Sequence, residues 1–261
     1  MRSAIISVCA GIVLGVGLLC SAASAQAHWD SAERNRIFAT LPNWAGLWES
    51  KFSADSNHLS GYAPISPAQF LVDIPLVGKP PYKAEWERQR QAAAKGAATP
   101  FKACVHVRFP FLLEGPFMFQ VFVTPEETVF LYDNGEVRHI YTDGRKHPKK
   151  EDLWPTDTGH SIGRWDGSTL IVDTIDVQSG PLAPGIVELS DRAHFMERVW
   201  MKGPNRMEDD LTIDDPVRFA HPWHVLTVWT RVLDQDRLLP YDCDNDRNPV
   251  VNGQITIAPP R

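Results

Sequence analysis

The chain has 261 residues and a formal net charge of −6 at neutral pH. Its Lys and Arg residues form no basic stripe, which argues against binding to nucleic acid. After residue 27, no stretch approaches the roughly 20 apolar residues that a membrane-spanning helix needs, so no membrane span is expected. The length allows a single domain with a sizeable hydrophobic core and leaves the oligomeric state open.

The first 27 residues have the pattern of a secretory signal peptide. Arg2 supplies the positive charge, residues 5–19 are apolar, and residues 23–27 contain small-residue cleavage sites. A lipoprotein with a lipidated Cys20 is the alternative, although Leu19 stands where the lipoprotein-processing enzyme prefers a small residue. The sequence therefore predicts that residues 1–27 are removed and that the protein is periplasmic or secreted.

Before residue 117 the sequence predicts two regular elements, a first strand at 44–52 and a helix at 83–95. The helical segment consists mostly of good helix formers, with Pro80 and Pro81 before it and Gly96 after it as start and stop signals. Residues 28–43 are polar and are expected to wrap around the domain. Residues 54–81 are expected to form a loop, and residues 97–116 are expected to be irregular.

From residue 117 onward the sequence is rich in β-strand patterns. Short apolar or alternating runs are separated by turns such as Asn134-Gly135 and Asp166-Gly167. The expected strands are 117–124, 128–132, 137–142, 161–165, 169–175, 192–201, 206–213, 223–233 and 238–242. The last two are expected to pair with each other. Consecutive antiparallel strands with one inserted helix predict a mainly β fold, an antiparallel barrel or curved sheet of about 8–10 strands.

Only two cysteines follow the predicted cleavage site, Cys104 and Cys243. A cysteine pair in an oxidising compartment favours a disulfide, and two separate buried thiols are the alternative.

A resemblance to a known family adds to this interpretation. Gly46-Leu47-Trp48 on the first predicted strand is similar to the Gly-x-Trp signature of lipocalins, in which the tryptophan plugs the closed end of the barrel. A longer pattern extends from Pro81-Tyr82 through residues 140–148, 159–174, 194–198, 212–216 and 222–223 to Tyr241-x-Cys243. It resembles a large family of secreted bacterial proteins with a lipocalin-like (calycin-type) barrel. The resemblance implies one such domain over residues 28–261 and no agreed activity.

His160 is the sharpest candidate for chemistry. It lies between Gly159 and Ser161 at the start of a predicted strand. A histidine there can act as a general base or orient a ligand, and the structural alternative is a ring that bonds a backbone carbonyl. If it is catalytic, an acidic or phenolic partner is needed, for which the candidates are Tyr141, Asp173 and Glu197.

A second group of candidates would contact a ligand. In the predicted strand 192–201, His194, Arg198 and Trp200 share one face and Glu197 points the opposite way. Polar groups beside aromatic side chains suit a barrel lumen, and an outer, exposed face is the alternative. The ligand-binding candidates are His194, Arg198, His139, Trp200, Phe109 and Phe111.

The remaining polar motifs have structural interpretations or point to no cofactor. Asp143 and Arg145 are expected to stabilise a turn, and Asp214 and Asp215 to cap backbone amides. The nine histidines include no His-Glu-x-x-His motif, and no Gly-x-Gly-x-x-Gly follows a strand. Neither a metal nor another cofactor is expected.

Three interpretations remain open at this stage. The first is an exported barrel that binds a small, largely apolar molecule, aromatic or terpenoid-like. The second is a cofactor-free lyase, isomerase or dehydratase that uses His160. The third is a structural or interaction protein of the cell envelope with a filled barrel. An open apolar cavity favours the first, and a histidine meeting a carboxylate favours the second.

Overall fold

The computed structural model describes residues 30–50, 80–96, 108–113, 115, 117–181, 188–239, 250–251 and 254–255. The predicted signal peptide and both predicted disulfide partners, Cys104 and Cys243, lie outside these residues. Among the residues described, no helix is long and apolar enough to cross a membrane.

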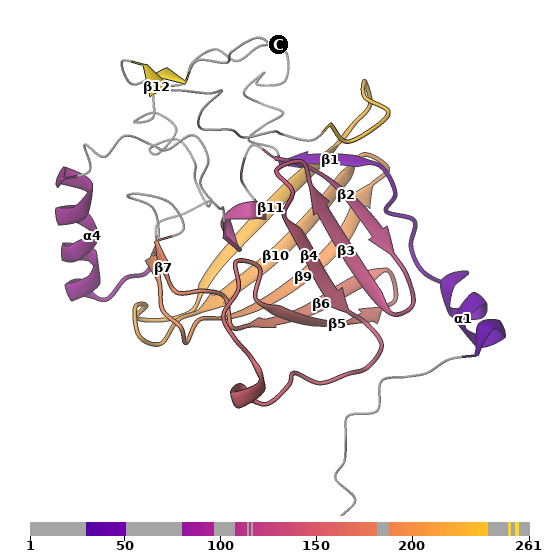
Figure 1. The fold of residues 1–261 in the computed structure, drawn as a ribbon, viewed down its shortest axis with the longest axis horizontal. Coiled ribbons are helices and arrows are strands. Elements are labelled where there is room, and N and C mark those ends of the chain that lie inside the picture. Colours follow the sequence, from indigo (N-terminus) through magenta and orange to yellow (C-terminus); the bar gives the residue numbers. More distant parts are fainter. Residues whose placement is uncertain are drawn as a thin grey trace, which may run out of the picture.

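Nine of the described strands close into a barrel in the order β1-β11-β10-β9-β6-β5-β4-β3-β2 (Figure 1). The barrel strands are β1 (Leu47–Ser50), β2 (Met118–Val123), β3 (Glu127–Tyr132), β4 (Val137–Tyr141), β5 (His160–Asp166), β6 (Thr169–Ile175), β9 (His194–Gly203), β10 (Arg206–Asp214) and β11 (Trp223–Val232). Two short pairs lie apart from it: β7 (Gly180–Pro181) with β8 (Glu188–Leu189), and β12 (Val250–Val251) with β13 (Gln254–Ile255). The predicted mainly β barrel is therefore confirmed.

Two strand pairings differ from the prediction. Strand β5 runs parallel to β4, because the chain crosses back through residues 142–159 before it re-enters the sheet, so the barrel is mixed rather than purely antiparallel. Strand β11 pairs with β10 and with β1, which closes the barrel. Its expected partner, 238–242, is described only as far as residue 239, and that part is not a strand.

Two α-helices are described. The predicted helix is confirmed as α4 (Ala84–Gly96), and the indole nitrogen of Trp86 ties it to the carbonyl of Val217 at 3.1 Å. Helix α1 (Ser31–Phe38) lies in the polar segment 28–43, for which the sequence predicts no helix. The Asp30 carboxylate caps it by accepting from the backbone N–H of Glu33 at 2.8 Å. Figure 1 shows both helices outside the barrel.

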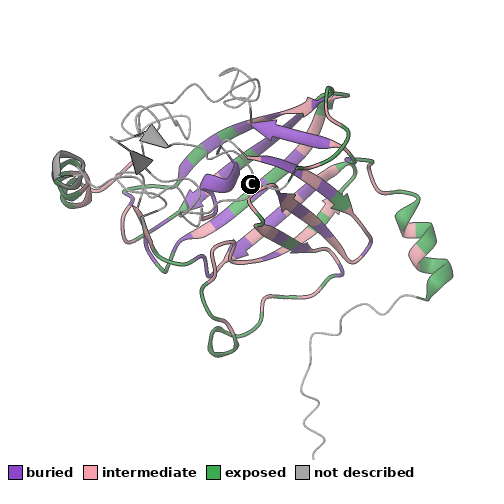
Figure 2. Ribbon diagram, turned by 45° about the horizontal axis from the view of Figure 1, so that its top comes forward, coloured by how far each residue is buried: buried purple, intermediate pink, exposed green. Residues whose placement is uncertain are grey.

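Apolar and aromatic side chains fill the described part of the barrel interior. The short 3-10 helix η2 (Phe111–Leu113) lies against it, where the Trp229 indole N–H donates to the carbonyl of Leu113 at 2.8 Å. Phe119 packs edge to face on Trp229. Many inward side chains have no exposed surface, among them Ile140, Leu170, Val172, Phe195, Leu211 and Trp229. Figure 2 shows buried stretches of the strands alternating with exposed and intermediate ones.

Trp48 is fully buried, as the Gly-x-Trp pattern predicts. Its indole N–H donates to the carbonyl of Trp44 at 3.0 Å, and the guanidinium of Arg231 lies 4.3 Å above its ring. Gly46 adopts a φ of +133°, and a Cβ at this position would collide with Arg231. The backbone conformation therefore favours glycine at this position, and a larger residue would also displace the Arg231 guanidinium.

Candidate functional site

Five polar side chains meet on the outer face of the barrel. Strands β4, β5, β6 and β9 are consecutive neighbours in the sheet, and each contributes one outward residue. The loop 142–159 contributes a histidine that reaches back over the same face. The cluster consists of Tyr141, His147, His160, Asp173 and His194.

Hydrogen bonds connect four of these side chains in series. The Nδ1 atoms of His147 and His160 lie 2.8 Å apart. His147 Nε2 is 3.2 Å from Asp173 Oδ1, and His194 Nε2 is 2.7 Å from the same oxygen. The Asp173 carboxylate therefore binds the imidazoles of His147 and His194, and His147 in turn binds His160.

This network determines which imidazole nitrogens carry protons. Ionised Asp173 can only accept, so His147 donates from Nε2, and in the singly protonated tautomer its Nδ1 is bare. That nitrogen accepts from the Nδ1–H of His160. His160, which uses Nδ1 in this contact, is then left with a lone pair on Nε2. A lone pair held in this way suits a general base.

The pKa shifts agree with this assignment. The hydrogen bonds from His147 and His194 hold the pKa of Asp173 well below its usual value. Burial is the largest cause that lowers the pKa of His160, which favours the neutral form of its ring. The bond to Asp173 raises the pKa of His194, which favours the protonated form of this ring.

Further outward groups flank His160. The ring of Tyr141 lies 5.6 Å from that of His160, and His139 stacks on the other side of Tyr141 at 6.2 Å. The guanidinium of Arg145 lies 3.9 Å above the Tyr141 ring. Asp143 holds that guanidinium at 2.7 Å, which confirms the predicted turn-stabilising pair.

The predicted inward orientation of one face of β9 is wrong. Along β9 the buried residues are Phe195, Glu197 and Val199, which point into the barrel. His194, Arg198 and Trp200 lie on the opposite, outer face together with Met196, which is 39% exposed. Phe195 and Val199 can face the lumen because Glu197, which lies between them on the same face, has its charge neutralised inside the barrel. His139 is outward as well, and its Nδ1 lies 2.8 Å from a Glu127 oxygen.

Glu197 does not join His160, because it is enclosed in the barrel. Its carboxylate bonds both terminal nitrogens of Arg138, one of them at 2.9 Å. Arg138 also donates to Thr174 at 2.9 Å and is 1% exposed. Arg138 is not among the residues predicted from the sequence, although it shares one face of its strand with the apolar Ile140, which is a signal for burial.

The two phenylalanines expected to stack on a ligand are parts of the core. Phe109 and Phe111 are 0% and 1% exposed. The Phe109 ring packs on Phe195 at 5.0 Å and lies 4.0 Å from the guanidinium carbon of Arg138. In this structure their contacts are with other core side chains.

Asp215 has the capping role that the sequence predicts. Its carboxylate accepts from the backbone N–H groups of Ser190, Val217 and Arg218 at 2.7–3.1 Å. This bonding is structural and lies outside the histidine cluster.

Within the described part of the chain, no three potential metal-binding side chains converge on one point. Comparison with known protein families and with characterised proteins found no match.

Proposed function

We propose that the protein is an exported acid–base enzyme of the lyase, isomerase or dehydratase type, with His160 as the general base. The observation that supports this proposal is the hydrogen-bonded series from Asp173 through His147 to His160. It fixes the tautomer of the last ring and leaves its Nε2 as a proton acceptor. A histidine that only fixed a loop would need no such series.

In the proposed reaction, His160 Nε2 takes a proton from a carbon next to a carbonyl group. The electron pair of the broken C–H bond moves onto the carbonyl oxygen. An isomerase returns the proton to a different carbon. In a lyase or dehydratase the carbonyl re-forms, the bond to the leaving group on the β-carbon breaks, and the leaving group takes the proton.

The neighbouring side chains have separate roles in this proposal. His147 and Asp173 are positioning residues, because they act on the substrate only through His160. Tyr141 presents a phenol beside the His160 ring and donates a hydrogen bond to the developing oxyanion. His194 shares the Asp173 carboxylate and holds it in place from the side of β9.

The alternative of an apolar ligand in the lumen has less support. Inward side chains such as Leu170, Val172 and Leu211 have no exposed surface, so a ligand could reach them only if they moved apart. The exposed polar cluster is therefore the better candidate site.

Three carbonyl compounds in D₂O test the proposal, one for each reaction type. Cyclohexanone reports proton exchange, 3-cyclohexen-1-one reports isomerisation, and 4-hydroxy-2-butanone reports dehydration. Wild type should accelerate at least one reaction, as followed by mass spectrometry. His160→Gln should lower that rate by about 100-fold or more, the usual contribution of a general base.

The matched control is His224→Gln, which changes an exposed histidine on β11 that bonds only Thr212 among the described residues, at 3.0 Å. This variant should retain the wild-type rate. Equal rates for wild type and His160→Gln with all three compounds would overturn the proposal.

A further inference from the structure

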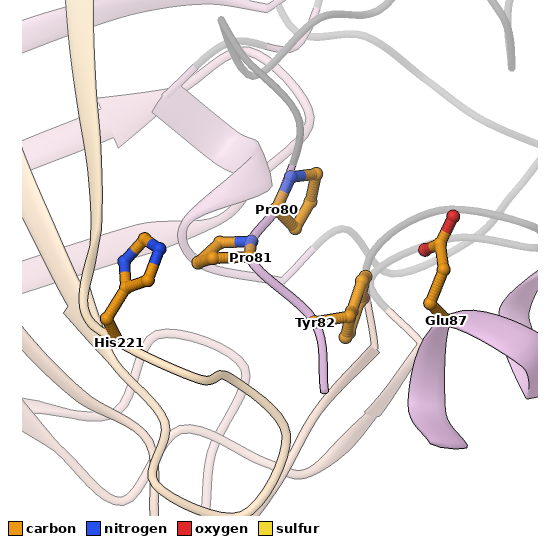
Figure 3. A pocket seen from close by; sticks show the side chains of 5 residues that line it. All are labelled: Pro80, Pro81, Tyr82, Glu87 and His221. Carbon is orange, nitrogen blue, oxygen red and sulfur yellow. The ribbon is translucent and has the colours of Figure 1, made fainter. Parts of the chain in front are cut away.

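A separate cavity of about 360 Å³ lies beside the start of α4 (Figure 3). Its lining consists of Pro80, Pro81, Tyr82, Glu87 and His221. Figure 3 shows His221 on one side of the two proline rings, with Tyr82 and Glu87 on the other. The volume is at the small end of the range for ligand cavities, about 300–1,000 Å³.

The two walls of this cavity are joined through the backbone. Tyr82 forms an antiparallel bridge with Phe219, and the Ala220 N–H donates to the carbonyl of Pro81 at 2.8 Å. The Tyr82 ring packs edge to face on Phe219 at 5.2 Å. The segment that bears the prolines and the segment that leads to His221 therefore keep a fixed separation.

Two of the three polar lining groups are already engaged. The Tyr82 hydroxyl accepts from the Glu188 N–H at 2.9 Å and donates to the Glu188 carbonyl at 3.4 Å. The Glu87 carboxylate binds Arg90 through two nitrogens at 3.0 and 3.1 Å, which neutralises its charge. A charged ligand would therefore find no unpaired counter-charge among these lining residues.

His221 supplies the remaining polar contact. Its Nδ1–H donates to the carbonyl of Pro222 at 2.9 Å, because a carbonyl oxygen can only accept. The neutral ring then has a lone pair on Nε2. A ligand that bonds to this nitrogen must bring a hydrogen-bond donor.

We propose that this cavity binds a small, uncharged aromatic compound that carries a hydroxyl group, that is, a phenol. The aliphatic C–H groups of Pro80 and Pro81 pack against the electron-rich face of the aromatic ring. The phenolic O–H donates to His221 Nε2. This site is distinct from the histidine cluster on the barrel and independent of the reaction proposed there.

Saturation-transfer NMR on the full chain tests the proposal with three matched probes. Phenol has both the ring and the donor, anisole lacks the donor, and cyclohexanol lacks the aromatic face. Phenol should bind about fivefold more tightly than anisole, which corresponds to ~1 kcal/mol for one hydrogen bond. Cyclohexanol should also bind more weakly than phenol.

His221→Ala should reduce phenol binding to the level of anisole while leaving the melting temperature unchanged, because His221 is exposed. His224→Ala is the matched control and should bind phenol like wild type. Phenol binding that survives His221→Ala, or equal affinities for phenol and anisole, would overturn the proposal. Loss of phenol binding in His160→Gln would place the probe at the barrel cluster and would also overturn it.

Discussion

At the scale of single residues, the barrel encloses three ionisable side chains, Arg138, Glu197 and Asp209. All are at most 1% exposed, and the Arg138 guanidinium is hydrogen-bonded to the carboxylate of Glu197. Burial, followed by the negative charge of Glu197, raises the pKa of Asp209 well above its usual value. We infer that Asp209 is a neutral acid in the folded protein.

This inference predicts how Asp209→Asn changes the pH dependence of stability. A carboxyl with a raised pKa in the folded state contributes stability at low pH, which is lost as pH rises from about 3.9 through the folded value. The asparagine side chain does not titrate, so the variant does not lose this stability as the pH rises. Its free energy of unfolding relative to wild type should rise by at least ~1.4 kcal/mol between pH 4 and pH 8, the equivalent of one pKa unit. Parallel urea-unfolding profiles over this range would contradict the inference.

Arg138 is the cation that pairs with the enclosed carboxylate of Glu197. Arg138→Met leaves Glu197 without its partner, and breaking a buried pair in this way costs about 3–5 kcal/mol. The control is Arg34→Met, which removes the exposed pair with Glu126 and should cost at most ~1 kcal/mol. Urea unfolding at neutral pH measures both. Similar losses in the two variants would show that the buried pair has no special importance.

The histidine cluster predicts an order of titration. The pKa of His194 should lie above, and that of His160 below, the ordinary value of about 6.5. The contribution of His194 to the free energy of unfolding is therefore present below about pH 6.5 and lost as the pH rises. The contribution of His160 is present above about pH 6.5 and lost as the pH falls. NMR titration of the imidazole ring protons checks the order of the two pKa values. The Asp173→Asn variant should return the pKa of His194 toward its ordinary value. The reverse order would contradict the assigned network.

At the scale of elements, local signals predicted the strands well. The Asn134-Gly135 and Asp166-Gly167 turns have positive φ angles at their glycines, +88° and +61°, as tight hairpins need. Strand β6 begins and ends at the predicted residues. Helix α1 has no buried residue, so no apolar period marks it in the sequence. The cap formed by Asp30 was its one available signal.

The entry of the chain into β1 depends on Gly46. Gly46→Ala should be more destabilising than Gly144→Ala, because both substitutions cause backbone strain, which costs about 1–3 kcal/mol, and at Gly46 the Arg231 guanidinium must also move off Trp48. Gly144 is the matched control, since its φ is also positive, at +81°, but a Cβ there meets nothing within 4 Å. Thermal or urea unfolding measures the difference. Equal losses would show that only the backbone angle matters at Gly46.

At the scale of the whole molecule, closure of the barrel determines which side of each strand is inside. The alternation of side chains along the strand predicted that His194, Arg198 and Trp200 share a face, but it could not show whether this face points into the barrel or outward. That choice depends on Arg138, which lies 59 residues from Glu197 in the sequence. His160, Asp173 and His194 were each predicted as candidates. Their connection through His147 depends on the crossing loop and could not be read from local patterns.

The predicted export of the protein favours a disulfide that links distant parts of the chain. Once residues 1–27 are removed, Cys104 and Cys243 are the two cysteines left, and an oxidising compartment favours their pairing. The disulfide would close a loop of about 140 residues, and loops of this length are stabilised by roughly 4–5 kcal/mol in chain-entropy models.

Protein recovered from the periplasm should therefore contain no titratable thiol when it is denatured without reductant. Its N-terminus should be Gln26 or His28. Cys104→Ser and Cys243→Ser should each lower the free energy of unfolding, and the double variant should lose no more than either single one, because all three lack the same bond. Two free thiols in the denatured protein would exclude the disulfide, and a lipidated Cys20 at the N-terminus would exclude the predicted cleavage.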